Sequence, residues 1–118
     1  MVVLRGVVVE GKRLGRQLGF PTANVMVGDD LAVDNGVYRS RVVVGGVEYR
    51  AVSNVGTNPT VADKGRRVES YIFDFEGDIY GETIEVELLA KLRDERRFGS
   101  VEELRDQVLR DIELARSL

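Results

Sequence analysis

The sequence predicts an all-β domain, a closed or nearly closed antiparallel barrel with one helix alongside. Three observations predict this fold: short segments rich in β-branched residues, glycine-containing turns between them, and a single amphipathic helix near the C-terminus. Closure into a barrel would also leave no exposed strand edge. We expect residues 1–118 to form one domain, because 118 residues supply one hydrophobic core and are too few for two.

Six segments have the composition and the boundaries of β-strands. They are residues 2–9, 22–27, 37–44, 47–55, 68–75 and about 82–89. Gly45 and Gly46 separate the third segment from the fourth and give a strong two-residue hairpin signal. Polar stretches containing glycine separate most of the others, so we expect loops on the barrel surface and a ligand that enters at a barrel mouth.

The helix is predicted to begin after Ser100. Ser100 and Glu103, three residues later, form a capping box. Apolar residues then recur at helical spacing, and they are Val101, Leu104, Val108, Ile112 and Ala115. We therefore expect one face of this helix to pack on the β-structure.

The composition excludes several kinds of chemistry. The chain has no cysteine and no histidine, which excludes thiolate or imidazole metal ligands and histidine-based nucleophilic catalysis. Acid–base chemistry would have to come from a carboxylate, lysine or tyrosine. The net charge of −3 argues against a nucleic-acid partner. No apolar run is long enough for a bilayer, so we expect no membrane partner and a cytoplasmic location.

The segment "GKRLGRQLGFPTAN", residues 11–24, combines regularly spaced glycines with basic side chains. The glycines are Gly11, Gly15 and Gly19, and the basic residues are Lys12, Arg13 and Arg16. Backbone N–H groups at glycines can approach an anion closely, and the cations add charge, so the segment is a candidate phosphate-binding loop. A flexible turn is the alternative, because the segment matches neither the P-loop nor the dinucleotide fingerprint.

The end of this segment is a candidate magnesium site. Pro21 favours an extended backbone before it, and on an extended chain Thr22 and Asn24 point to the same face. Hydroxyl and amide oxygens are ligands that Mg²⁺ accepts, with water and phosphate completing its shell. The alternative is a turn in which both side chains bond to the local backbone.

Glu69 is a candidate general base. In "VESYIFDF" a strand would place it on the same face as three aromatic residues, Tyr71, Phe73 and Phe75. Partial desolvation on that face would favour proton uptake by the carboxylate. The alternative is a strand end in solvent, or an ion pair with Arg66 or Arg67.

The run "LRDERRF" is a candidate flap over a planar ligand. Arg93 and Phe98 bracket it and could present a cation and a ring. A solvated charged surface is the alternative interpretation.

In this order the motifs resemble the riboflavin kinase family. "GKRLGRQLGFPTAN" is similar to the family's signature segment, and "NVGTNPTV", "VESYIFDFEGDIYG" and "LRDERRFGSVEELRDQVLRDIELAR" are similar to its later blocks. The resemblance covers residues 7–116. It implies a six-stranded antiparallel Greek-key barrel with a C-terminal helix, and transfer of the γ-phosphoryl group of ATP to the 5′-hydroxyl of riboflavin, giving FMN and ADP.

The resemblance also implies roles for individual residues. Thr22 and Asn24 would bind Mg²⁺ together with the nucleotide phosphates, and Glu69 would be the catalytic base. The loop with Gly11, Lys12, Gly15, Arg16, Gly19 and Pro21 would cover the phosphates. Arg93 and Phe98 would belong to the flap over the flavin, and Tyr80 would lie near the nucleotide.

Two rival functions are weighed against the kinase, and the resemblance also bears on a second activity of the family. A flavin-binding barrel without catalysis would need the aromatic residues and Arg93 but not Thr22, Asn24 and Glu69 together. A structural barrel would use the glycine segment only as a turn. Bacterial members of the family usually carry an adenylyltransferase module that converts FMN to FAD. We expect this chain to lack that module and to need it as a partner for that second step.

Overall fold

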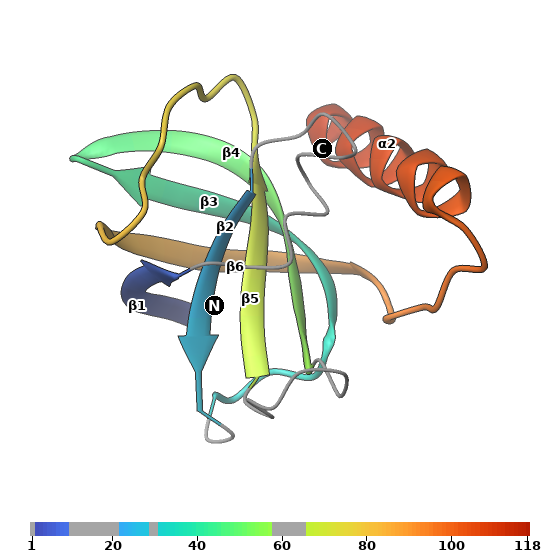
Figure 1. The fold of residues 1–118 in the computed structure, drawn as a ribbon, viewed down its shortest axis with the longest axis horizontal. Coiled ribbons are helices and arrows are strands. Elements are labelled where there is room, and N and C mark those ends of the chain that lie inside the picture. Colours follow the sequence, from blue (N-terminus) through green and yellow to red (C-terminus); the bar gives the residue numbers. More distant parts are fainter. Residues whose placement is uncertain (1, 10–21, 29–30, 58–65) are drawn as a thin grey trace.

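The described residues form six antiparallel strands that close into a barrel, with one helix against its outside (Figure 1). The computed structural model describes residues 2–9, 22–28, 31–57 and 66–118. The strands are β1 (Val2–Val9), β2 (Thr22–Val27), β3 (Gly36–Val44), β4 (Val47–Thr57), β5 (Arg66–Ile72) and β6 (Thr83–Arg93), and the helix is α2 (Val101–Ser117).

The strand order around the barrel is β1-β2-β5-β4-β3-β6, and β6 pairs with β1 to close it. Strands β3, β4 and β5 are consecutive antiparallel neighbours, while β2 lies beside β5 and β6 lies beside β3. This order contains two overlapping Greek keys. The predicted six-stranded Greek-key barrel with a C-terminal helix is therefore confirmed.

Alternate residues of each strand fill the barrel interior, and valine is the commonest of them. Leu4 and Val8 of β1, Val25 of β2 and Val68 of β5 belong to one buried cluster. Small side chains suit an interior enclosed by only six strands, because every strand contributes to the same narrow space. The interior is therefore packed with side chains and holds the barrel together.

Three buried hydroxyls form a hydroxyl ladder through this interior. Ser40 Oγ and Ser53 Oγ are 2.7 Å apart, and Ser53 Oγ and Ser70 Oγ are also 2.7 Å apart. All three side chains are almost fully buried. The ladder crosses β3, β4 and β5, and each hydroxyl has a hydrogen-bonded neighbour within it.

Helix α2 packs on the outer wall of the barrel through its C-terminal half. Ala115 joins Val37, Val52 and Phe73 in a second buried cluster, separate from the barrel interior. The prediction that one helical face packs on the β-structure is confirmed for Val108 and Ala115, which are buried. It is wrong for Val101, which is 46% exposed because the first turn extends beyond the barrel wall.

The capping box at the start of α2 is confirmed in modified form. Ser100 Oγ accepts a hydrogen bond from the backbone N–H of Glu103 at 3.2 Å. The Glu103 carboxylate accepts from the N–H of Gly99, one residue earlier than the usual partner.

Strand β5 ends earlier than the sequence predicts. It stops at Ile72, and the chain then turns through Asp74, which has a positive φ of 56°. Phe73 consequently packs under α2, while Phe75 packs edge-on against Tyr49 with ring centres 5.1 Å apart. The prediction of three aromatic residues on the face of Glu69 is therefore wrong, and Tyr71 alone shares that face on the strand.

Candidate active site

The side chains of Asn24, Glu69 and Asn54 lie in one row across three neighbouring strands. Asn24 of β2 is directly paired with Glu69 of β5, and Glu69 is directly paired with Asn54 of β4. Directly opposed residues of antiparallel strands project from the same face, with Cβ atoms about 4.5–5.5 Å apart. We call these three residues the polar row.

The polar row lies on the outer wall of the barrel. The alternate residues of the same strands, Ala23, Val25, Val55 and Val68, belong to the interior cluster. The row therefore faces away from the interior, whereas the sequence predicts a ligand at a barrel mouth. Asn24 is nevertheless only 6% exposed, so part of this wall is shielded from solvent.

A second pair of residues lies next to the polar row. Thr22 of β2 is directly paired with Tyr71 of β5, so Thr22 and Asn24 share a face, as predicted. Burial raises the pKa of Tyr71 above its ordinary value, and the negative charge of Glu69 and a hydrogen bond to it raise it further. Tyr71 therefore keeps its proton and can donate it in a hydrogen bond to the carboxylate.

The structure excludes one of the alternative partners considered for Glu69. Arg66 projects from the other face of β5, and its guanidinium donates to the carbonyls of Leu31 and Val33 and to Asn35 Oδ1. This side chain is thus used to hold the loop before β3. These contacts do not test the catalytic role of Glu69, which stays a prediction.

The guanidinium of Arg93 forms an ion pair with helix α2. It donates to both carboxylate oxygens of Asp111, with Nε 2.9 Å from Oδ1 and the nearer terminal nitrogen 2.8 Å from Oδ2. Asp111 is 4% exposed and also accepts a hydrogen bond from Gln107. Sequence analysis missed Asp111, although an acidic residue beside the apolar stripe of the helix was a usable signal.

Phe98 lies close to the cations of the predicted flap. Its ring centre is 5.9 Å from the Arg93 guanidinium carbon and 5.0 Å from that of Arg96. The two residues that the sequence predicts as a cation and a ring are thus neighbours. Binding of a planar ligand by them stays a prediction.

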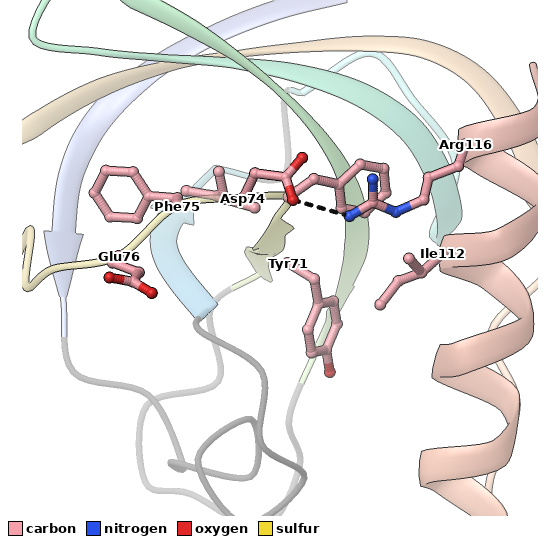
Figure 2. A pocket seen from close by; sticks show the side chains of 8 residues that line it. Tyr71, Asp74, Phe75, Glu76, Ile112 and Arg116 are labelled. Atoms are coloured by element: carbon pink, nitrogen blue, oxygen red, sulfur yellow. Dashed lines mark hydrogen bonds and ion pairs between the residues drawn. The ribbon is translucent and has the colours of Figure 1, made fainter.

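A cavity of about 670 Å³ opens between the end of β5 and helix α2 (Figure 2). Its lining includes Tyr71, Phe73, Asp74, Glu76, Ile112 and Arg116. Tyr71 and Ile112 are directed into the space between the strand and the helix, and Arg116 lies 3.4 Å from the Asp74 carboxylate (Figure 2). Because Tyr71 lines the cavity and also interacts with Glu69, the cavity adjoins the polar row.

Tyr80 lies in the turn between β5 and β6 and is 47% exposed. The next residue, Gly81, donates its N–H to the carbonyl of Val8 near the end of β1. Tyr80 is thus beside the strand end from which residues 10–21 continue. The predicted phosphate-loop residues Gly11, Lys12, Gly15, Arg16, Gly19 and Pro21 lie outside the described residues.

The donor chemistry at Thr22 and Asn24 suits a hard cation. Both side chains offer a neutral oxygen on one face of β2, next to the carboxylate of Glu69. Within the described ranges, no cluster of three or more acidic residues could hold a metal by itself. Phosphate oxygens would have to supply most of the negative charge. Helix α2 is the one helix described there, and it could not span a bilayer.

The family model for riboflavin kinase, Flavokinase, matches residues 1–118. The chain belongs to the riboflavin kinase family. One curated relative is the RNA-binding riboflavin kinase RibR of Bacillus subtilis, which is 46% identical over 95% of this chain and 49% of the relative. Another is the bifunctional riboflavin kinase/FMN adenylyltransferase of Escherichia coli, which is 42% identical over 92% of this chain and 35% of the relative. This riboflavin kinase family member thus spans about half or less of these relatives.

Two solved structures are similar to this chain over nearly its whole length, and one of them is a riboflavin kinase. Riboflavin kinase from Trypanosoma brucei superposes with a TM-score of 0.66 at 28% identity, covering 98% of this chain and 77% of that one. A Streptococcus pneumoniae protein described as a macrolide-efflux protein superposes with a TM-score of 0.85 at 42% identity, covering 98% of this chain and 38% of that one. The absence of a nucleic-acid partner stays a prediction, since one relative of the riboflavin kinase family is described as RNA-binding.

Proposed function

We propose that this chain is an ATP-dependent riboflavin kinase that transfers the γ-phosphoryl group of ATP to the 5′-hydroxyl of riboflavin, giving FMN and ADP. Family membership supports the reaction. The observation that supports the assignment of the site is the direct pairing of Asn24 with Glu69, with Thr22 and Tyr71 on the adjacent pair of positions. Neutral oxygen donors and a carboxylate therefore share one face of the barrel wall.

In this proposal Glu69 is the general base. Its carboxylate accepts the proton of the 5′-hydroxyl as the oxygen attacks the phosphoryl group. Tyr71 holds the carboxylate through a donated hydrogen bond, which leaves the remaining carboxylate lone pairs for the substrate. No histidine is required for this chemistry, which fits a sequence that contains none.

Thr22 and Asn24 would hold Mg²⁺ together with the phosphates of ATP. A bound Mg²⁺ neutralises phosphate charge, which is the main electrostatic requirement of phosphoryl transfer. Both ends of the segment 10–21 are attached next to this position, because Val9 is paired with Asn24 and Thr22 follows the segment directly. We therefore propose that Gly11, Lys12, Gly15, Arg16 and Gly19 cover the phosphates.

The cavity beside Tyr71 is proposed to receive the flavin ring. Its volume of about 670 Å³ lies within the range of small-molecule sites, and Phe73 and Ile112 give it apolar walls. From there the ribityl chain of riboflavin would extend past Tyr71 towards Glu69. Arg93 and Phe98 would then border the same ligand from the end of β6.

The domain assignment and the location in the cell are also proposals. We propose that residues 1–118 form one riboflavin kinase domain that acts in the cytoplasm. The adenylyl transfer of the bifunctional relative is not assigned to these residues.

The direct test of the function is incubation of the protein with riboflavin, MgATP and no other enzyme, followed by chromatography for FMN. We expect Glu69→Gln to bind riboflavin nearly normally and to lower kcat by about 10²–10⁴-fold, because the base acts on the transition state. Binding of flavin by the wild-type chain without FMN formation would refute the kinase. Near-normal turnover of Glu69→Gln would refute the base alone.

The metal assignment has its own test. Asn24→Ala is expected to raise the Mg²⁺ and ATP concentrations needed for half-maximal rate together, because metal and phosphates bind as a unit. The measurement is the initial rate across a grid of Mg²⁺ and ATP concentrations at saturating riboflavin. A change confined to the KM for riboflavin would contradict the assignment.

A further inference from the structure

The amide oxygen of Asn54, in the polar row, is a buried acceptor without a donor. Within the described part of the chain, the other buried side-chain polar atoms without a hydrogen-bond partner are the Nε atoms of Arg39 and Arg67. Native proteins pair nearly all such atoms, because an acceptor removed from water and left unpaired is destabilising. The Asn54 amide therefore requires an explanation other than stability of the free protein.

Among the described residues, those directly opposite Asn54 carry no hydrogen-bond donor on their side chains. Glu69 lies directly opposite Asn54 on β5, and Val37 lies directly opposite it on β3. Two residues along β4, a side chain at Gly56 would overlap the carboxylate of Glu95, which occupies the space there. Ionised carboxylates only accept hydrogen bonds, and the valine side chain is apolar. These three neighbours of Asn54 are thus acceptors or apolar groups.

The neighbouring cations do not satisfy the Asn54 amide either. Arg93, on the far side of Val37, donates to Asp111 and to the carbonyl of Asp94. Arg67 shares the outer face of β5, but Asn54 Oδ1 accepts no hydrogen bond from it. No described residue donates to this amide oxygen, so it is available to a donor on a bound molecule.

We propose that Asn54 binds the acceptor substrate, with its amide oxygen accepting a hydrogen bond from the hydroxyl adjacent to the one that is phosphorylated. This proposal rests on the kinase function proposed above. Asn24 lies on one side of Glu69, towards the phosphates, and Asn54 lies on the opposite side. A hydroxyl-bearing chain that extends past Tyr71 and brings its terminal hydroxyl to Glu69 therefore comes within reach of Asn54.

The distance between Glu69 and Asn54 determines which substrate hydroxyl the Asn54 amide can reach. Cβ atoms of directly paired residues are about 4.5–5.5 Å apart, so the Glu69 carboxylate and the Asn54 amide can reach adjacent oxygens of one polyol chain. For riboflavin this is the 4′-hydroxyl, next to the 5′-hydroxyl. The expected specificity is for acceptors with two vicinal hydroxyls at the end of the chain.

The test compares riboflavin with 4′-deoxyriboflavin as acceptors for wild type and Asn54→Ala. A site built around a substrate hydroxyl rejects the analogue that lacks it, because its own polar group is then left unpaired. We expect wild-type kcat/KM to fall at least tenfold with the analogue. Asn54→Ala should be about tenfold slower with riboflavin and should show no further loss with the analogue.

Each outcome decides a separate question. A wild-type protein that makes no FMN refutes the kinase function. An active wild type that does not discriminate between the two flavins overturns the inference, as does an Asn54→Ala variant that keeps the full discrimination. A rise in the Mg²⁺ requirement of Asn54→Ala with both flavins, and unchanged discrimination, would place the amide on the metal side and also overturn it.

Thermal unfolding without ligand supplies a second measurement with a matched control. Asn35→Ala should lower the Tm, because Asn35 Oδ1 accepts two hydrogen bonds from Arg66, at 3.1 and 3.0 Å. Asn54→Ala should leave the Tm at or above that of wild type, because its amide oxygen has no internal donor to lose. A loss of stability equal to that of Asn35→Ala, or failure to fold, would make Asn54 structural and refute the inference.

Discussion

At the scale of single residues, Tyr71 lies between two charged groups that belong to different parts of the fold. The carboxylate of Glu69 is one, and the ion pair of Arg93 with Asp111 is the other. Tyr71 also lines the cavity proposed for the flavin ring. One side chain thus interacts with the candidate base, is affected by the charges of Asp111 and Arg93, and borders the candidate substrate cavity.

The raised pKa of Tyr71 predicts a stability change in alkaline solution. An unfolded tyrosine ionises near pH 10, whereas folded Tyr71 keeps its proton to higher pH. Above about pH 10 the unfolded chain therefore binds fewer protons than the folded one, and the contribution of Tyr71 to stability is lost as the pH rises. We expect the Tm of wild type to fall more steeply between about pH 9 and 11.5 than that of Tyr71→Phe. Parallel curves would contradict this.

At the scale of elements, the junction of β6 and α2 depends on one partly buried ion pair. Arg93 ends β6, and Asp111 lies in the middle of α2. The Asp111 side chain is 6% exposed and that of Arg93 is 22% exposed. Since α2 packs on the barrel mainly through its C-terminal half, this pair is a main attachment of the middle of the helix.

Asp111→Asn is expected to destabilise the protein by about 1–3 kcal/mol, because Arg93 would be left without its counter-charge. The value lies below that of a fully buried pair, since Arg93 retains contact with water. Urea unfolding followed by circular dichroism gives the measurement. Asp106→Asn, an exposed change on the same helix, is the control and should alter stability by less than about 0.5 kcal/mol. Equal effects of the two variants would disprove the role of the pair.

Strand positions and the hairpin of β3 with β4 were predictable from the residues, but the partners of the other strands were not. The bounds of β1 and β2 agree with the predicted ranges, because apolar content and turn residues are local signals. The pairing of β2 with β5 joins residues 39 to 49 positions apart, so no local pattern predicts that Asn24 and Glu69 are opposite each other. The early end of β5 depends on the positive φ of Asp74, a conformation that aspartate adopts only occasionally.

At the scale of the whole molecule, closure of the barrel depends on a close approach between β1 and β2. Gly6 belongs to β1, and a Cβ at this position would lie 2.5 Å from Val25 Cγ1. Val25 is 1% exposed and fills the interior at that level. Glycine at position 6 therefore lets the first strand pass between β2 and β6.

Gly6→Ala is expected to lower the free energy of unfolding by about 1–3 kcal/mol, the usual effect of overpacking a filled interior. Combining it with Val25→Ala should give less destabilisation than the sum of the two single changes, because the second change removes the clash. Chemical denaturation of the three variants and wild type tests this. Simple additivity would show that the contact between Gly6 and Val25 does not limit closure.

The hydroxyl ladder of Ser40, Ser53 and Ser70 has a consequence for the orientation of the barrel wall that carries the polar row. An interior rich in valine distinguishes poorly between alternative alignments of neighbouring strands, since one valine fits nearly as well as the next. Sliding β5 by one position would turn every one of its side chains over, removing Ser70 from Ser53 and pushing Glu69 and Arg67 into the barrel. Three small alcohols in the interior thereby help to fix Glu69 on the outside, where a substrate can reach it.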